Sequence, residues 1–415
     1  MRGLPWITAV RLVGVPLAFV LMVCLSTAQP LRQELSDTLN AMPSVRRLMV
    51  AFAVIAVFSV VVSGDVGLSM SKLIVAGLNW FLVFYVSVFV FRQPGNLMRL
   101  AYLVWICALI LSAIGLQEWR HSAVPWAGHI PSFLTVQDET VLRVLSGSSR
   151  AATGIYRVQG KFTTPLGFAE FYALTVPFVI HFAFSASRTW VRVAAALTIP
   201  LIFFVITLTD SRLGIVGFFL AFLVYLLFWS LRRWNSNRES AIGPLIVLAY
   251  PAIFCGFIAS TFFVRRLSNM VWGNGAQQAS TESRKLQYAM GLPKVLERPW
   301  GYGIGRGGEV LGFTNQAGIG TIDTYYLAAA LEFGIVGFIV YYAMFALGVW
   351  NGGRRSMLAA DREHMLVAPV TIALVNFIII KSIFSQLENH ALVFSLLGAL
   401  VAICYRIDAR KPHDS

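Results

Sequence analysis

The chain has 415 residues, of which 57% are hydrophobic and 13% are charged, and its formal net charge is +14. A soluble protein of this length needs far more charge to cover its surface. This composition therefore excludes a water-soluble globular protein and indicates an integral membrane protein.

Apolar segments that are long enough to cross a bilayer recur along the whole chain. A helix crosses the hydrocarbon core in about 20 apolar residues, and about eleven segments (roughly 10–12) meet that length. The sequence therefore predicts an all-α fold, a polytopic transmembrane helical bundle. The predicted spans are 6–27, 48–63, 73–91, 97–116, 167–186, 190–208, 213–230, 243–262, 322–348, 365–381 and 389–405.

These spans form three bundles separated by two long loops, and no soluble domain or internal repeat interrupts them. We expect both loops to face outward, away from the cytoplasm, and the second to carry a helix at the membrane interface. The predicted segments are an N-terminal transmembrane bundle (1–116), a first periplasmic loop (117–166), a central transmembrane bundle (167–262), a large periplasmic loop (263–321), and a C-terminal transmembrane bundle with a cytoplasmic tail (322–415).

The amino-terminal segment is the hardest part of the chain to orient. Its first 28 residues are similar to a secretory signal, but many spans follow, so we expect a retained first helix. Short loops rich in Lys and Arg usually face the cytoplasm. All five basic turns of this chain can be cytoplasmic at once in an arrangement that places the amino terminus outside. Either the polar stretch 28–47 contains a half-buried element or a further short span exists. The basic turns are Arg92 with Arg99, Arg188 with Arg192, Arg232 with Arg233, Arg354 with Arg355, and Arg406 with Arg410 and Lys411.

Both long loops carry more basic than acidic residues, although they face the side that usually has fewer basic ones. Arginine suits an anionic ligand because its planar fork donates two parallel hydrogen bonds to phosphate. Contact with lipid headgroups is the alternative explanation. In the second loop the basic residues are Arg265, Arg266, Arg284, Lys285, Lys294, Arg298 and Arg306, against Glu282, Glu297 and Glu309.

The second loop contains a short amphipathic helix that begins near Ser280 and Thr281. We expect Gly291 and Pro293 to interrupt it. Arg284 would lie near its amino-terminal end, where free backbone N–H groups favour an anion. A helix that merely closes the end of the bundle is the alternative.

Two further segments place charge beside a span. In Asp210-Ser211-Arg212, the arginine either extends to headgroups or points into a polar cavity, and Asp210 is a possible partner. Arg157 and Lys161 precede the span that contains Glu170. A carboxylate at that depth needs a partner, and we expect a salt bridge from Glu170 to Lys161 or Arg157.

Asp323 lies at the start of a span on the outer side and has two interpretations. It is either a helix cap or a general base, whose proton affinity rises in a low-dielectric pocket. Tyr325 and Glu332 extend the same polar and aromatic face. His390, at the start of the last span, is a second candidate base, although an isolated histidine is more often a packed residue.

Phosphate-cradling and metal-binding motifs are not supported. The glycine run 301–308 does not follow a strand in a βαβ unit, so its context excludes a nucleotide-binding loop. The sequence has no Asp-x-Asp pair and no His/Cys cluster, and its four cysteines lie in apolar spans without a partner at metal or disulfide spacing. We therefore expect no metal and no cofactor.

Four blocks over about 155–340 together resemble the O-antigen ligase and Wzy-type polysaccharide polymerase superfamily. Each block is weak alone, but their order and spacing, with a large outer loop before the last spans, are typical of that superfamily. The blocks are Arg157 to Pro165, Thr209 to Arg212, Ser283 with Arg284 through Arg298 to Gly305, and Asp323 to Leu327 with Glu332 to Gly337.

The resemblance implies a GT-C-like, metal-independent membrane glycosyltransferase on the outer face of a bacterial inner membrane. Its donor would be a glycan on undecaprenyl diphosphate, its acceptor a second glycan, and its other partners membrane lipids and polysaccharide assembly proteins, with no nucleic acid. The two family arginines that bind the diphosphate correspond to Arg212 and Arg284. Asp323 stands where ligases of this superfamily carry histidine, which favours a polymerase. Further substrate contacts are expected from Arg157, Lys161, Arg306, Tyr325, Glu332 and His390.

Two other functions remain open. A ligase would transfer the glycan to a lipid or protein acceptor. A transporter or flippase of an anionic lipid or solute would also use arginines and membrane-embedded acids. Transporters, however, tend to bind their substrate near the bilayer midplane within inverted repeats, whereas the charges here gather at the outer edge.

Overall fold

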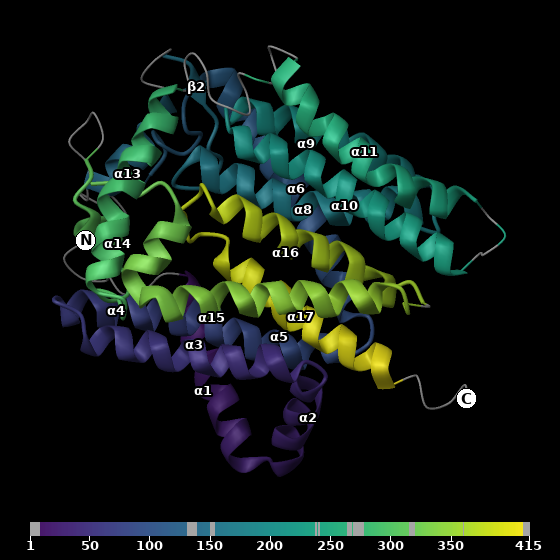
Figure 1. Cartoon of the computed structure of the whole chain (residues 1–415), viewed down its shortest axis with the longest axis horizontal. Coiled ribbons are helices and arrows are strands. Elements are labelled where there is room, and N and C mark those ends of the chain that lie inside the picture. The colour runs from purple at the N-terminus through teal and green to yellow at the C-terminus, as the bar shows by residue number, and fades with distance from the viewer. Residues whose placement is uncertain are drawn as a thin grey trace.

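A computed structural model describes residues 9–130, 139–149, 154–236, 239, 241–263, 268, 278–314, 320–359 and 361–409 of the chain. The long helices run roughly along one axis and form a single bundle (Figure 1). Ten helices of the described residues are long and apolar enough to span a membrane, or up to eleven if one bent pair counts as a span. The predicted all-α polytopic bundle is therefore confirmed. Arg265, Arg266, Arg410 and Lys411, which entered the charge arguments, lie outside the described residues.

The candidate spans agree with most of the predicted segments. The described spans outside the amino-terminal region are α3 (Pro43–Val61), α4 with a π-helix and α5 (Val66–Arg92), α6 (Asn96–His121), α8 (Pro165–Ser185), α9 (Thr189–Leu208), α10 (Arg212–Ser236), α11 (Ile242–Phe263), α15 (Tyr325–Ser356), α16 (Val367–Lys381, preceded by a 3-10 turn over His364–Leu366) and α17 (His390–Ala409). The shorter helices are α7 (Glu139–Leu145), α13 (Gln278–Glu297) and α14 (Gly307–Leu311).

The polar stretch 28–47 contains a helix, as one of the two alternatives anticipated. Helix α1 (Ala9–Thr27) turns by 104° into α2 (Gln29–Asn40). Both helices project from the side of the bundle (Figure 1). Helix α2 is polar and partly buried, and Glu34 ties it to α5 through a 3.0 Å ion pair with Arg92.

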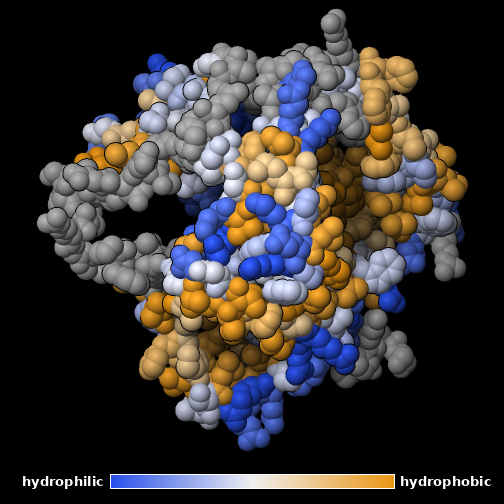
Figure 2. All heavy atoms as spheres, turned by 60° about the vertical axis from the view of Figure 1, so that its left-hand side comes forward, coloured by the Kyte–Doolittle hydropathy of each residue, from blue (hydrophilic) through white to orange (hydrophobic). Residues whose placement is uncertain are grey.

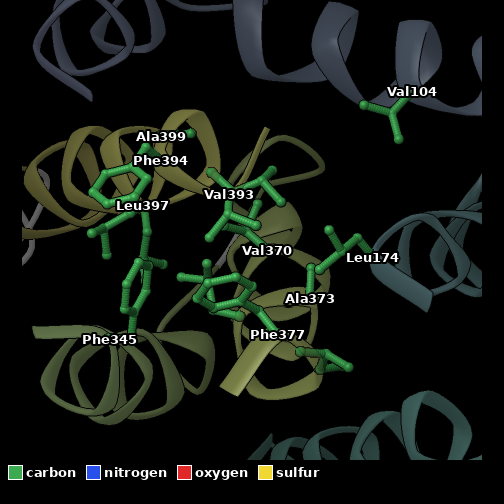
Figure 3. Close-up of a cluster of buried hydrophobic side chains, with 14 of the residues drawn as sticks. Val104, Leu174, Phe345, Val370, Ala373, Phe377, Val393, Phe394, Leu397 and Ala399 are labelled. Carbon is green, nitrogen blue, oxygen red and sulfur yellow. The ribbon is translucent and has the colours of Figure 1, made fainter. Parts of the chain in front are cut away.

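The centre of the bundle is built from α8, α16 and α17. Side chains around the whole circumference of α8 are buried from Gly167 to Phe182, as expected for a helix enclosed by other helices. Figure 3 shows the adjoining core, where Phe345 of α15, Phe377 of α16 and Phe394 of α17 meet. The rings of Phe345 and Phe377 lie 4.9 Å apart, in a tilted arrangement. The buried helices α8, α16 and α17 therefore form the rigid centre to which the functional residues are attached.

The basic turns gather at the end of the bundle opposite the long loops (Figure 1). There Arg355 forms an ion pair with Asp408, and Arg406 pairs with Glu363 at 2.8 Å. Glu363 also accepts hydrogen bonds from the backbone N–H groups of Gly95 and Leu97. Burial alone would raise the pKa of the Glu363 carboxyl, but Arg406 and these hydrogen bonds together hold it below its usual range. We refer to this end as the basic end.

At the opposite end, one buried carboxylate anchors the first long loop. Strands β1 (Ser148–Ser149) and β2 (Tyr156–Arg157) pair antiparallel within this loop. Glu118, at the end of α6, accepts hydrogen bonds from the Tyr156 hydroxyl at 2.8 Å and from the backbone N–H of Gly160 at 2.7 Å. The carboxylate thus holds the segment that carries Arg157 against the bundle.

Candidate active site

A cavity of about 710 Å³ opens at the end of the bundle that carries the long loops, where hydrophilic residues gather between apolar ones (Figure 2). Arg157, Arg212, Arg284 and Asp323 all line it, although they come from four separate segments of the chain. Four of the nine predicted site residues are therefore brought together. The remaining lining residues are Ser149, Leu166, Asp210, Ser211, Leu213, Val216, Ser280, Thr281, Lys285, Tyr288, Ile383 and Phe384.

Arg212 reaches the cavity because a tight turn separates α9 from α10. Asp210 adopts the left-handed conformation with a φ of 48°, which an aspartate tolerates better than most residues. The hydroxyl of Ser211 then accepts a hydrogen bond from the backbone N–H of Gly214 at 3.3 Å and so stabilises the start of α10. The guanidinium of Arg212 donates to the Thr281 hydroxyl across the cavity at 3.5 Å, which brings α10 and α13 together.

Arg157 is fixed from the same turn. Its Nε donates to the carbonyl oxygen of Thr209 at 3.0 Å, and the neighbouring Val158 N–H donates to the Leu208 carbonyl at 3.1 Å. These two contacts attach β2 to the end of α9. The guanidinium of Arg157 therefore lies on the same cavity wall as Arg212.

Arg284 lies in the second turn of α13, on the face that meets the cavity. Its guanidinium donates to the Ser280 hydroxyl at 2.9 Å, one turn earlier in the helix. The predicted interruption of this helix was wrong, because α13 continues through Gly291 and Pro293 to Glu297. The glycine is needed for close packing, since a Cβ at Gly291 would lie 2.8 Å from the Leu327 side chain.

Asp323 is partly buried between Arg284 and Gln287. Helix α15 starts at Tyr325 after Thr324, so Asp323 precedes the capping position and is not the first-turn residue that the sequence suggested. Its backbone N–H donates to the fully buried Gln287 side-chain oxygen at 2.9 Å. Burial raises the pKa of the Asp323 carboxyl, and the Arg284 charge and the Gln287 amide hold part of that rise back.

The cavity has an apolar floor beneath its charged rim. Phe384 and Ile383, directly after α16, pack with Leu166 at the start of α8 and Leu213 at the start of α10. The cavity is therefore amphipathic. Its cations and the carboxylate lie toward the loops, whereas its hydrocarbon surface lies toward the membrane-spanning helices.

Glu170 has a partner that the sequence did not identify. It pairs with Lys381 of α16, with Nζ 2.8 Å from Oε1 and both side chains fully buried. The predicted salt bridge to Lys161 or Arg157 is therefore wrong. The Nδ2 of Asn389 donates to the other Glu170 oxygen at 3.1 Å. Lys161 is exposed, and its ammonium lies 5.4 Å from the ring of Phe162, outside the cavity lining.

Tyr325 and His390 are packed into an aromatic cluster instead of the cavity. Their rings lie 5.1 Å apart, and His390 also stacks on Trp80 at 5.4 Å. Both side chains are buried. In this structure they pack together at the starts of α15 and α17.

The glycine run docks onto a break in α15. Gly334 interrupts that helix with a φ of 73°, and the exposed carbonyls of Leu331 and Glu332 accept hydrogen bonds from Tyr302 and Gly303 at 2.8 and 3.1 Å. The N–H of Ile335 completes the contact by donating to Pro299. In this structure the run thus serves as a packing element against α15.

Glu332 and Arg306 lie on the other side of this contact. Glu332 accepts from the Gly307 N–H at 3.3 Å and lines a second cavity of about 410 Å³ with Lys72 and Glu388. Arg306 pairs with Glu309 at 2.7 Å, and hydrogen bonding with ion pairing raises the pKa of Arg306. Neither residue lines the cavity of Arg212 and Arg284.

Sequence reasoning missed the neighbours that complete the cavity. Lys285 and Tyr288 lie on the Arg284 face of α13, and the Tyr288 hydroxyl is 3.2 Å from that of Thr324. The spacing of four residues from Arg284 to Tyr288 on a helix was the available signal, whereas Lys285, one residue after Arg284, gave none by spacing. Gln287 gave no such signal, because a glutamine beside a basic helix is an ordinary surface residue. Within the described ranges, no group of three or more His, Cys, Asp or Glu side chains is arranged to hold a metal ion.

Comparison with known families agrees with the resemblance noted from the sequence. Residues 196–342 match the family model described as O-antigen ligase. The matched segment contains Arg212, Arg284 and Asp323, whereas Arg157 lies outside it. A comparison with curated proteins finds no match. Residues 196–342 of this multi-pass membrane protein thus match an O-antigen ligase domain, and the matched family indicates a membrane glycosyltransferase-like enzyme of the ligase and polymerase type, for which it implies lipid-linked glycan and acceptor substrates.

Proposed function

We propose that this protein is a polymerase that joins undecaprenyl-diphosphate-linked oligosaccharide repeat units into a surface polysaccharide, an exopolysaccharide or O-antigen, by metal-independent, inverting glycosyl transfer. One observation carries the proposal. Two arginines and a half-buried carboxylate line a single cavity above an apolar floor. A lipid-linked diphosphate sugar needs all of these surfaces at once, and the identity of Asp323 favours a polymerase within this superfamily.

The arginines would bind the donor diphosphate and stabilise it as it leaves. Arg212 and Arg284 are already held near one another by the Thr281 and Ser280 hydroxyls. Cations fixed in advance stabilise a developing anion without reorganising during the reaction, and each such group typically contributes about 10²–10³ in rate. Arg157 and Lys285 would add positive charge to the same cavity.

Asp323 would act as the general base on the acceptor. The carboxylate takes the proton of an acceptor sugar hydroxyl while that oxygen attacks the anomeric carbon. A new carbon–oxygen glycosidic bond forms, and the bond from the anomeric carbon to the phosphate oxygen breaks. Undecaprenyl diphosphate leaves with the bonding electron pair, and attack opposite to it inverts the anomeric centre. The raised pKa of Asp323 suits this role, because a stronger base abstracts the proton more readily.

The charge distribution supports a periplasmic site in a bacterial inner membrane. The basic turns at Arg92, Arg188, Arg232, Arg354 and Arg406 meet at one end of the bundle, and the cavity lies at the other. Because short basic loops stay in the cytoplasm, the cavity would face the periplasm, where lipid-linked repeat units are joined.

A ligase that transfers the glycan to a lipid or protein acceptor is the second candidate, favoured by the description of the matching family. Both enzymes would use the same donor contacts and differ only in the acceptor. A transporter or flippase of an anionic lipid or solute is the candidate from another class. It would move the substrate without breaking the glycosyl–phosphate bond.

One experiment separates these functions. The purified protein is incubated with lipid-diphosphate-linked repeat units, and the products are resolved by glycan length. We expect longer glycan, with one undecaprenyl diphosphate released for each new glycosidic bond. Transfer that occurs only after a lipid or protein acceptor is added would indicate a ligase, and an unchanged donor would exclude both enzymes.

Variants of the cavity residues test the assigned roles. We expect Arg212→Ala and Arg284→Ala each to lower turnover by about 10²–10³, the usual loss for one electrostatic group. Arg306→Gln is the matched control, because it removes an equal charge from the same end but outside the cavity. Full activity in both cavity variants, or an equal loss in the control, would exclude the diphosphate contact.

A further inference from the structure

A third cavity, also charged, lies at the basic end, far along the helices from the site described above. It encloses about 310 Å³ between the last turns of α8, α10 and α15 and the start of α16. The residues at its wall include His181, Tyr225, Trp229, Arg232 and Arg233. The described residues that line this cavity include two arginines and neither Asp nor Glu, so no carboxylate at the cavity wall neutralises the positive charge of the arginines.

The polar groups of this cavity are held in place from inside the bundle. His181, which is 5% exposed, lies with its Nδ1 3.3 Å from the Tyr225 hydroxyl. Arg232 donates to the Ala359 carbonyl oxygen at 2.6 Å, which fixes its guanidinium at the wall. These groups form a preset polar surface between helices.

Arg233 has a donor that the described protein atoms leave unused. Its Nε is buried and has no hydrogen-bond partner in the described part of the chain. The guanidinium lies 5.6 Å from the ring of Trp229, which is 41% exposed. A buried donor without a partner is costly, so an acceptor from outside the chain would satisfy it.

We propose that this cavity binds the phosphate group of an anionic membrane lipid. A pair of guanidinium groups presents forked donors of the kind that match phosphate oxygens, and basic pockets between membrane helices bind such headgroups. Trp229 supports a lipid source, because exposed tryptophan lies at the level of the headgroups. The lipid's chains lie along the apolar surface of α10, with the phosphate between Arg232 and Arg233.

The cavity also shares three elements with the candidate active site. Helices α8 and α10 carry Leu166 and Arg212 at their opposite ends, and α16 leads into Phe384. A lipid that bridges α8, α10 and α16 at the basic end therefore stabilises the helices on which the active site is built. This binding is independent of the proposed enzymatic reaction.

The test measures lipid retention on the full-length protein in detergent by native mass spectrometry. Phosphatidylglycerol is the probe, phosphatidylcholine the zwitterionic comparison, whose choline cation neutralises its phosphate, and inorganic phosphate the soluble competitor. We expect phosphatidylglycerol to bind at least tenfold more tightly than phosphatidylcholine and to resist millimolar phosphate, because its acyl chains contact the apolar helix surface in addition to the phosphate contact. Equal retention of both lipids would refute the proposal. Displacement by inorganic phosphate would identify a soluble phosphate ligand and also overturn the lipid assignment.

Variants locate the binding. Arg233→Gln should weaken phosphatidylglycerol binding about fivefold and the Arg232→Gln, Arg233→Gln double variant roughly twenty-fivefold. Because Arg232 also contacts the backbone, the single Arg233 variant remains informative if the double variant does not fold. The control is Arg99→Gln with Arg192→Gln, which removes the same charge from exposed positions at the same end. Unchanged binding in Arg233→Gln, or an equal loss in the control, would refute the site.

Discussion

Replacing Lys381 by methionine removes one member of an ion pair that is enclosed between α8 and α16. The partner, Glu170, is fully buried, its Oε1 lies 2.8 Å from the lysine ammonium, and Asn389 donates to its other oxygen at 3.1 Å. After the substitution the carboxylate keeps one amide donor and loses its countercharge. Water cannot compensate it at this position.

The expected loss of stability depends on what the Glu170 carboxyl does after it has lost its lysine partner. It either stays charged and unpaired or takes up a proton, and protonating an ordinary glutamate at pH 7 costs about 4 kcal/mol. Breaking buried ion pairs typically costs about 3–5 kcal/mol, in agreement with that limit. We therefore expect Lys381→Met to lower the free energy of unfolding by about 4 kcal/mol at pH 7.

The assay compares unfolding of the variants in detergent by heat and by SDS titration. Adding Glu170→Gln to Lys381→Met should restore most of the loss, because no charge then remains buried. Glu34→Gln, which breaks the half-exposed pair with Arg92, serves as a control and should cost less than about 1 kcal/mol. A loss below about 1 kcal/mol for Lys381→Met, or no recovery in the double variant, would refute the assignment of a buried, mutually dependent pair.

Three further outcomes follow from the candidate active site and its supports. A base works only when it is deprotonated, and burial raises the pKa of Asp323, so the elongation rate should fall on acidification at a pH above the ordinary range of an aspartate. Asp323→Asn should abolish turnover, and normal turnover in that variant would leave Asp323 only a structural role. Gln287→Glu keeps an acceptor for the Asp323 N–H but places a second negative charge beside the Asp323 carboxylate, so the acid limb of the pH–rate profile should move to higher pH. A shift to lower pH would contradict this electrostatic effect of residue 287 on Asp323. Gly334→Ala should destabilise the protein by at least about 2 kcal/mol, since its φ of 73° disfavours alanine and a Cβ would collide with the Pro299 carbonyl; Gly312→Ala, whose surroundings are open, tests the conformational part alone in thermal unfolding.

Much of the fold was predictable because a bilayer imposes a length and a polarity on each helix. The predicted spans over 97–116, 167–186 and 190–208 match α6, α8 and α9 closely. The amino-terminal region was harder. The predicted span 73–91 misses the first turns of Val66–Arg92, where Ser69 and Lys72 interrupt the apolar pattern. The bend between α1 and α2 likewise depends on packing against the bundle, which hydropathy does not encode.

The candidate site was predictable where charge stood out against an apolar background. Arg212 and Arg284 drew attention for that reason, the family resemblance assigned both to one diphosphate, and the cavity brings them together. The partner of Glu170 was not, because Lys381 is distant in sequence and a nearby cation offered a simpler pairing. Helix periodicity describes which residues share one face of one helix, but it does not identify which helices become neighbours.

The relative positions of Arg284 and Asp323 depend on two clamps between α13 and α15. Near the cavity, the Gln287 side chain accepts from the Asp323 N–H. At the far end of α13, the chain turns back so that Tyr302 donates to the Leu331 carbonyl and Pro299 accepts from Ile335. Two separated attachment points prevent α13 from rotating against α15, which one alone would permit. The glycine run that first suggested a phosphate loop therefore contributes to the site indirectly: by docking on the break at Gly334, it holds the arginine and the carboxylate beside one another in one cavity.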